Sequence, residues 1–337
     1  MNIKQIAKKA GVSVATVSRV LNHPETVAET TREKIQKIID EEEYKPNWFA
    51  RGLNFNRTKT LGLLIPHTLG STYMEIANGV EEVARQKGYI TFMCNVEKDP
   101  QIEKEYVNQL INRRVDGIIL MFSALDDSYM ELIEEKNIPA VLIGENKVKC
   151  GWSSVTTNCR SGAADMVRHL AECGHSRIGI LCGRDPEQEG RDMLKGYCDV
   201  MKKCGRGEDP RLKSSVENSI EGGYIGMKQM LSEVRPDAIF ATSDEIAYGA
   251  MEAVKDMGMS IPGDIAVAGF GNSRMSNLVE PKLSTVEQPY RKMGIYGARI
   301  LFDMIEGETE EPQHIILQGK LRIRKSCGHT DRIGEMF

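Results

Sequence analysis

From residue 60 onward, short apolar runs alternate with amphipathic stretches of helical periodicity. LGLLIP (61–66) and GIILMF (117–122) are two such runs, and residues 73–87 and 126–136 form helical stretches that follow apolar runs. This alternation is typical of βαβ units, in which helices cover both faces of a parallel sheet. The pattern therefore predicts an α/β body built on parallel strands.

The alternation occurs twice, with a break near residues 155–158. Near residues 286–289 the chain can cross back, so that a last helix (290–306) and strand (313–318) return to the first lobe. Two such lobes enclose a cleft, which is the usual place for a small ligand. We expect the first lobe to comprise residues 60–157 and 289–318, and the second residues 158–288 and 319–337.

The first 45 residues have a different pattern and predict three short helices. Asn2 and Gln5 form a capping-box pair, and Gly11 ends the first helix. Ser13 is a suitable N-cap for a second helix from Val14 to about Asn22. A third helix, at about 29–43, turns its isoleucines inward. Two helices joined by a tight turn predict a helix-turn-helix, whose second helix can lie in the major groove.

The charge is distributed unevenly along the chain. The formal net charge is −4, but residues 1–60 carry 11 Lys/Arg against 7 Asp/Glu. All seven of these acidic residues lie between Glu25 and Glu43, so residues 1–24 and 44–60 contain basic residues and no acid. A basic head on an acidic body is typical of a nucleic-acid-binding protein.

Several classes of protein are disfavoured by composition. No stretch of the 337 residues approaches the roughly 20 apolar residues of a membrane helix. The N-terminus lacks the features of a signal peptide, so we expect a cytoplasmic protein with no membrane partner. The eight cysteines contain no C-x-x-C pair, and we interpret them as reduced and mostly buried.

The segment A7-x-x-A10-G11-V12-S13-x-x-T16-V17-S18-R19-V20-L21-N22 resembles the helix-turn-helix of the LacI-type family of bacterial transcription regulators. Further motifs in the family's order extend the resemblance over nearly the whole chain. They are Y44-K45-P46-N47, A50-R51-G52-L53, T58-K59-T60-L61-G62, R114-V115-D116-G117, G174-H175-S176-R177-I178 and V267-A268-G269-F270. The resemblance implies a helix-turn-helix head at residues 1–46, a hinge at 47–59, and a body similar to periplasmic sugar-binding proteins.

The resemblance also implies roles in DNA binding. Val14 and Ala15 occupy the specificity positions of the recognition helix, and Arg19 matches an arginine that contacts bases or phosphates. In the hinge helix, Leu53 matches a leucine that wedges into the minor groove and kinks the duplex. The remaining expected DNA-binding residues are polar or basic: Ser13, Thr16, Ser18, Asn22, Asn47, Arg51 and Arg57.

The ligand cleft departs from the family pattern. Family members that bind sugars present two aspartates and a second arginine at positions that are Gly144, Gly271 and Met193 here. We interpret Asp244 as a helix N-cap. The candidate effector-binding residues are Tyr73, Glu145, Trp152, Arg191, Asp192, Ser243 and Asn272. By resemblance, the expected effector is a sugar or sugar derivative.

A metal site and an enzyme active site are two other kinds of site that residue spacing can indicate. His169, Cys173 and His175 have a spacing that zinc can use, but the family commonly fills both histidine positions without a metal. The sequence contains no G-x-S-x-G, Walker A or G-x-G-x-x-G motif. We therefore expect no metal, no cofactor and no enzymatic activity.

The sequence as a whole predicts a repressor that binds a near-palindromic operator as a homodimer and responds to a small molecule in the cleft. A ligand-binding protein or enzyme on the periplasmic-binding fold is an alternative, but such proteins lack the N-terminal head. A second alternative is a regulator whose effector is a partner protein, which the missing polar anchors leave open.

Overall fold

A computed structural model of the chain describes residues 2–42, 57–67, 71–144, 151–184, 188–206, 209–309 and 311–328. The chain divides into two compact units. One comprises Met1–Lys59 with Arg114–Asp116, and the other comprises Thr60–Arg113 with Gly117–Phe337. The predicted hinge helix, which begins near Trp48, lies outside the described residues.

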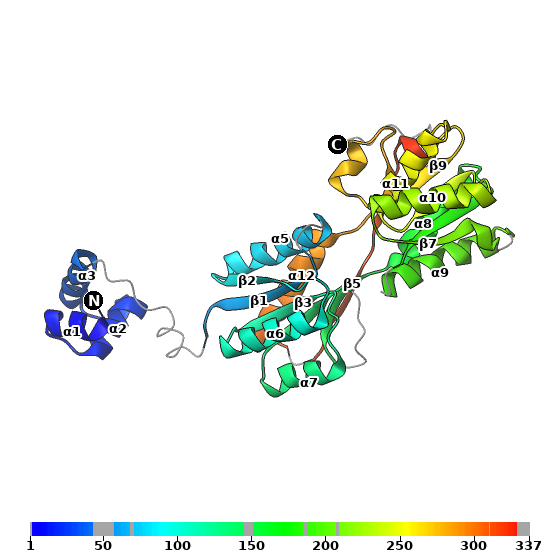
Figure 1. The fold of residues 1–337 in the computed structure, drawn as a ribbon. Helices are drawn as coiled ribbons and strands as arrows, with labels where there is room; N and C mark the ends of the chain where they lie inside the picture. The colour runs from blue at the N-terminus through cyan, green and yellow to red at the C-terminus, as the bar shows by residue number, and fades with distance from the viewer. Residues whose placement is uncertain are drawn as a thin grey trace. The chain divides into compact units, whose positions relative to one another are not determined.

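The N-terminal unit contains helices α1 (Ile3–Ala10), α2 (Val14–Asn22) and α3 (Glu29–Glu41), with a short 3₁₀ turn at Pro24–Thr26 (Figure 1). Asn2 and Gln5 form the predicted capping box, and Gly11 ends α1 with a φ of 68°. One apolar cluster joins the three helices, and the predicted inward isoleucines of α3 belong to it. Its buried members are Ile6, Ala7, Ala10, Val17, Val20, Ile35, Ile38 and Ile39.

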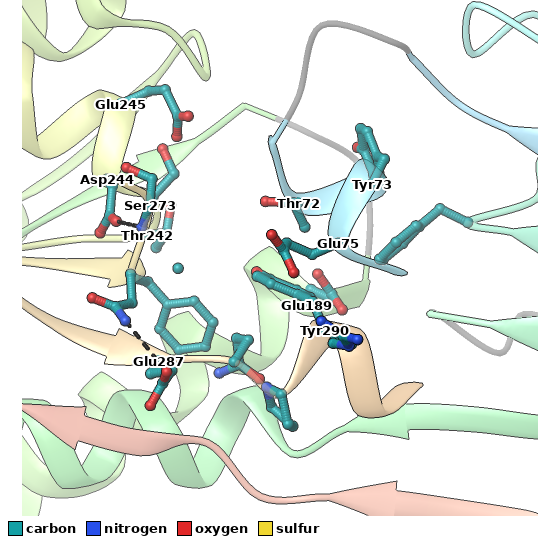
Figure 2. Close-up of a pocket in the computed structure, with 18 of the residues that line it drawn as sticks. Thr72, Tyr73, Glu75, Glu189, Thr242, Asp244, Glu245, Ser273, Glu287 and Tyr290 are labelled. Atoms are coloured by element: carbon teal, nitrogen blue, oxygen red, sulfur yellow. Dashed lines mark hydrogen bonds between the residues drawn. The ribbon is translucent and has the colours of Figure 1, made fainter. Parts of the chain in front are cut away.

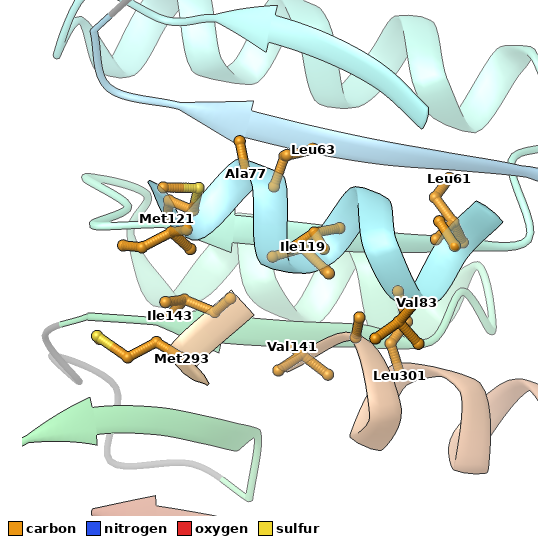
Figure 3. Close-up of a cluster of buried hydrophobic side chains, with 14 of the residues drawn as sticks. Leu61, Leu63, Ala77, Val83, Ile119, Met121, Val141, Ile143, Met293 and Leu301 are labelled. Atoms are coloured by element: carbon orange, nitrogen blue, oxygen red, sulfur yellow. The ribbon is translucent and has the colours of Figure 1, made fainter. Parts of the chain in front are cut away.

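The first lobe of the body is a six-stranded parallel sheet in the order β11-β5-β4-β3-β1-β2. Helices α5 (Ser71–Gln86) and α12 (Tyr290–Glu306) pack against one face, as the apolar cluster in Figure 3 shows. On the opposite face, Leu110 of α6 (Pro100–Asn112) packs directly over Gly62. The remaining elements are α7 (Asp127–Glu135), β1 (Thr60–Ile65), β2 (Ile90–Asn95), β3 (Gly117–Met121), β4 (Ala140–Ile143), β5 (Ser153–Thr157) and β11 (His314–Leu317).

The second lobe repeats this plan with the strand order β12-β10-β9-β8-β6-β7, in which only β12 is antiparallel. Helices α8 (Cys159–Glu172) and α9 (Gln188–Lys203) share one apolar cluster with the sheet. Helices α10 (Ile220–Glu233) and α11 (Asp244–Asp256) share another. The strands are β6 (Ile178–Gly183), β7 (Lys213–Val216), β8 (Ala238–Ala241), β9 (Ala266–Gly271), β10 (Ser284–Glu287) and β12 (Lys320–Arg322), with 3₁₀ turns at Pro210–Leu212, Arg274–Asn277 and Lys325–Cys327.

The chain crosses between the lobes three times: after β5, between β10 and α12, and between β11 and β12. The predicted α/β body of two similar lobes is thus confirmed, and the last helix and strand do return to the first lobe. Four strands, β5, β7, β10 and β12, were not foreseen. They are three to five residues long and rich in Ser, Thr, Lys and Arg, so no apolar run marks them.

The described cysteines and helices test the expectations that most cysteines are reduced and buried and that no helix spans a membrane. Seven cysteines are described and none of these forms a disulfide, but only Cys94, Cys159 and Cys327 are buried, and Cys204 is exposed. The expectation that most cysteines are buried is therefore wrong. Among the described helices, none has the length and apolar character that a bilayer-spanning helix requires.

Candidate functional site: a recognition helix and an inter-lobe cavity

The recognition helix α2 begins at a side-chain cap. Ser13 Oγ accepts a hydrogen bond from the backbone N–H of Thr16 at 3.1 Å, and the two hydroxyl oxygens lie 2.9 Å apart. This cap satisfies one of the free N–H groups at the start of the helix and orients its first turn. The local sequence S-V-A-T therefore fixes where the predicted DNA-reading surface begins.

One side of α2 is exposed and the other is buried. Val14, Ala15 and Arg19 are exposed, whereas Val17 and Val20 pack into the core of the head. Ser13 is exposed as well, and Thr16 and Ser18 are half-buried. The structure thus brings these predicted residues to the first turns of one helix, the part that contacts base edges in helix-turn-helix proteins.

The hinge residues are described only in part. Asn47, Arg51 and Leu53 lie outside the described residues, while Arg57 is described and exposed. Next to Arg57, Asp116 accepts hydrogen bonds from the backbone N–H of Thr58 at 2.7 Å and of Lys59 at 2.9 Å. The Asp116 carboxylate thereby holds the end of the hinge segment.

A cavity of about 1070 Å³ lies between the two lobes of the body. Its walls come from the carboxyl ends of the strands and the starts of the helices that follow them, together with the segments that cross between the lobes (Figure 2). This is where α/β sheets bind ligands, because loops and helix N-termini converge there.

Aromatic side chains form part of the cavity wall. The rings of Tyr73 and Phe122 pack edge to face with their centroids 5.5 Å apart. A Cβ at Gly144, whose φ is 105°, would lie 2.5 Å from the Phe122 ring. The Phe122 ring thus fills the space that a side chain at position 144 would need.

Asp244 is a buried charged group in the wall of the cavity, and its interpretation as an N-cap is wrong. Ser243 caps α11 instead, and Asp244 is the first residue of that helix. The Asp244 carboxylate accepts hydrogen bonds from the Ser273 N–H at 2.6 Å, the Ser276 hydroxyl at 2.8 Å and the Thr285 hydroxyl at 2.6 Å. These bonds fasten the loop after β9 to β10 and α11.

The negative charge of Asp244 affects the pKa of a neighbouring tyrosine. Burial raises the pKa of Tyr248 to about 12, with a further contribution from the Asp244 carboxylate. The Tyr248 hydroxyl lies 2.6 Å from that of Ser273 and 3.1 Å from that of Ser276. Because the phenol stays neutral near pH 7, it can take part in this network as a hydrogen-bond donor.

Three of the predicted effector residues line the cavity: Tyr73, Ser243 and Asn272. The Ser243 hydroxyl donates to Asn218 Oδ1 at 2.6 Å, and Asn272 Oδ1 accepts from Arg324 at 2.6 Å. Both polar groups are thus already held by protein partners, which fix their orientation at the cavity surface.

The other predicted effector residues are not brought to the cavity. Arg191 is exposed and Asp192 pairs with Lys195 at 2.9 Å, whereas their neighbour Met193 does line the cavity. Consecutive helical residues point in different directions, so only one of the three faces the cleft. Trp152 is buried before β5, at the opposite end of the sheet, and its indole N–H donates to Glu134. Glu145 lies outside the described residues.

Sequence reasoning missed several residues of the cavity wall, chiefly Glu75, Glu189, Gln288 and Tyr290. Glu75 and Glu189 lie in the first or second turn of their helices, and Gln288 and Tyr290 flank the crossing at Pro289. The signal that could have found them is their position directly after a strand or at a crossing, where parallel-sheet proteins build their sites.

The residues considered for zinc form a different arrangement. His169 Nε2 lies 3.4 Å from Cys327 Sγ and 3.6 Å from Cys173 Sγ, while His175 Nε2 lies 3.3 Å from the Cys327 carbonyl oxygen. Burial raises the pKa of Cys173 to about 11. Within the described ranges no cluster of three metal-ligating side chains is present.

A basic helix-turn-helix head followed by a two-lobed ligand-binding body defines a class of DNA-binding transcription regulators. The family model for "Bacterial regulatory proteins, lacI family" matches residues 2–47, and the model for a "Periplasmic binding protein-like domain" matches residues 167–327. Catabolite control protein A of Staphylococcus xylosus is 33% identical over 96% of this chain and 98% of its own length.

Two solved structures are similar to this chain over nearly its whole length. A crystal structure of the lac repressor dimer bound to operator and the anti-inducer ONPF has a TM-score of 0.86 at 26% identity, covering 97% of this chain and 99% of its own. The transcriptional regulator CelR in complex with cellobiose has a TM-score of 0.74 at 29% identity, covering 97% and 99%.

The chain belongs to the LacI family of bacterial transcription regulators. The match at residues 2–47 supplies the head that a ligand-binding protein or enzyme on the periplasmic-binding fold lacks, so that alternative is not supported. CelR is a transcriptional regulator, and the lac repressor was solved bound to operator.

Proposed function

We propose that the protein is a repressor that binds a near-palindromic operator as a homodimer. A small molecule that occupies the inter-lobe cavity lowers or raises its affinity for the operator. The observation that carries this proposal is the joint presence of an exposed, base-reading helix face and a large cavity in the body. Because its target is chromosomal DNA, such a regulator works in the cytoplasm.

In this proposal the exposed face of α2 enters the major groove. Val14 and Ala15 offer apolar contacts to bases, and Arg19 offers the bidentate donors that suit guanine. Ser13, Thr16, Ser18 and Asn22 anchor phosphates, together with Arg57. Asn47, Arg51 and Leu53 act in the minor groove through the hinge.

The dimer is supported by apolar side chains left exposed on a single chain. The edge strand β2 exposes 58% of Ile90, 40% of Phe92 and 43% of Met93. An edge strand with large exposed apolar groups is a surface that proteins normally cover. A second copy that covers it would also place two heads on one palindromic site.

The effector is supported by the cavity and by relatives. CelR was solved with cellobiose and the lac repressor with ONPF, each in a structure that aligns with this chain over nearly its whole length. A cavity of about 1070 Å³ accommodates a molecule of sugar size. Ligand-dependent coupling to DNA affinity in such proteins is typically about 1–3 kcal/mol.

Fluorescence anisotropy on a labelled operator fragment from the chain's own genome tests the DNA-binding role. Arg19→Ala is expected to weaken specific binding by about 1–3 kcal/mol and to relax base preference, because it removes the guanine-reading donors. Lys37→Ala is the matched control, since it removes the same charge from α3, where the side chain is 79% exposed.

The control should retain base preference. If Arg19→Ala binds the operator and random DNA with unchanged affinities, Arg19 faces solvent and the proposed reading surface is wrong. If the unsubstituted protein shows no preference for any operator over random DNA, the proposed regulatory function itself fails.

A further inference from the structure

The charged residues that line the cavity and are not exposed are all acidic. Glu75 on α5, Glu189 on α9 and Glu287 on β10 are half-buried and Asp244 on α11 is buried, whereas Glu245 is exposed. The cationic residues that line the same cavity are all exposed, at its rim: Lys98, Arg274, Arg291, Lys292, Lys320 and Arg322. Two of these cations are paired with carboxylates, Arg291 with Glu82 at 2.9 Å and Arg322 with Glu287 at 2.6 Å.

Glu75 and Glu189 come from different lobes and point into the same part of the cavity, next to Tyr290 (Figure 2). Burial, followed by the charge of Glu189, raises the pKa of Cys159 and of Tyr290. The Cys159 thiol and the Tyr290 phenol are therefore neutral near pH 7, and the negative charge at this place comes from carboxylates alone. The half-buried carboxylates of Glu75 and Glu189 make this part of the cavity anionic.

Gln288 is a second and independent sign of a ligand. This side chain is 5% exposed and lines the cavity on the segment that crosses from β10 to α12. Among the described residues, neither its Oε1 nor its Nε2 has a hydrogen-bond partner. A buried amide without hydrogen-bond partners is energetically unfavourable, so such a group in a cavity wall is typical of a site completed by a ligand.

We propose that the effector is a small polyhydroxylated amine, an amino sugar, whose ammonium group lies between Glu75 and Glu189 and whose hydroxyl groups bond to Gln288. This inference rests on the proposed function, because it specifies the ligand of the same cleft. The ammonium donates charge-assisted hydrogen bonds to the two carboxylates and gains cation–π attraction from the rings of Tyr73, Phe122 and Tyr290. A sugar phosphate would meet like charge at the same place.

The proposal also accounts for the departures from the family's sugar-binding pattern. The positions that would supply hydroxyl-reading carboxylates and a guanidinium are Gly144, Gly271 and Met193 here. The cavity instead combines carboxylates on helices of both lobes with aromatic faces, which together suit a compact cation. Because Glu75 and Glu189 lie on opposite lobes, an ammonium between them would favour the closed arrangement of the body.

Isothermal titration calorimetry on the full chain tests the charge of the ligand with matched probes. D-glucosamine, D-galactosamine and D-mannosamine are each compared with the neutral parent sugar and its 6-phosphate. We expect one amine to bind at least tenfold more tightly than its neutral parent and the phosphate to bind more weakly than either. Glu75→Gln and Glu189→Gln should each lower the affinity for the amine by roughly ten- to hundredfold, because each removes a charge-assisted hydrogen bond.

Two further variants separate direct contact from general effects. Glu81→Gln removes the same charge from an exposed position of α5 that does not line the cavity, and it should leave amine affinity unchanged. Gln288→Ala should lower the binding affinities for the amino sugar and for its neutral parent by a similar factor, because it removes contacts to the hydroxyl groups that both sugars carry.

The outcomes separate this inference from the proposed function. Operator binding that responds to a neutral sugar or a sugar phosphate, with no preference for the amine, would overturn the ligand class and leave the regulatory function standing. Failure of every amine to bind in the millimolar range would also overturn it. Loss of operator preference in the unsubstituted protein would instead count against the regulatory function.

Discussion

Asp244 organises one wall of the cavity at the scale of a single residue. Its carboxylate is 1% exposed and accepts three hydrogen bonds from two other segments of the second lobe. A buried carboxylate is tolerated only when its lone pairs are satisfied in this way. The Asp244 carboxylate thereby helps to hold the loop that carries Asn272 and Ser273 at the cavity.

Asp244→Ala is expected to lower the free energy of unfolding by about 3 kcal/mol, because it leaves three donors without an acceptor in a buried place. Urea unfolding followed by circular dichroism measures this change. Asp165→Ala, which removes a carboxylate that is 45% exposed and paired with Arg168, serves as the control and should change stability by no more than about 0.5 kcal/mol. Similar values for the two variants would mean that the Asp244 network contributes no more than a surface ion pair.

At the scale of elements, the recognition helix depends on its cap. Helix α2 has nine residues, which is too short to be stable in water by itself. It is held by the burial of Val17 and Val20 on one side and by the Ser13 cap at its start. The packing thus decides which side of α2 stays at the surface, where the proposed DNA-reading residues lie.

Ser13→Ala is expected to destabilise the first turn of α2 by about 1 kcal/mol, since it removes the acceptor of the Thr16 N–H. Hydrogen exchange should show the Thr16 amide opening about fivefold more often. Ser219→Ala removes the equivalent cap of α10, where Ser219 Oγ accepts from the Gly222 N–H at 3.0 Å. That control should leave exchange in the head unchanged, and an equal effect of both variants on Thr16 would contradict a local role for the cap.

At the scale of the whole molecule, the proposed regulation requires two copies of the chain. The sheet of the first lobe has β2 at one edge and β11 at the other. On β2 three large apolar side chains are exposed, whereas on β11 the only large apolar side chain that is exposed, among the described residues, is that of Ile316, at 62%. The two edges of one sheet therefore differ in the surface they offer a partner.

Phe92→Asp is expected to weaken dimer formation by at least tenfold, because it places a charge on an apolar face that would be desolvated in the dimer. Sedimentation equilibrium over a range of protein concentrations measures the change. Ile316→Asp introduces the same charge at the opposite edge and should leave association unchanged. An unchanged dimer with Phe92→Asp would assign the interface to another surface.

The sequence by itself determined the order of the elements, the head and the family. Apolar periodicity and capping residues are local signals, so helix α2 and the strands predicted at 61–66, 117–122 and 313–318 lie within a residue or two of their predicted bounds. The residues expected on the recognition helix follow from the same local order, because cap and periodicity fix which side of a helix is buried.

The composition of the cavity was decided only by the tertiary structure. Glu75, Glu189 and Gln288 are far apart in the sequence and share no motif, and the crossings between the lobes bring them together. Arg191 and Met193 are two positions apart on one helix, and only the packing of α9 decides that Met193 faces the cleft. The identity of a neighbour across a cleft depends on long-range packing, which no local pattern in the chain records.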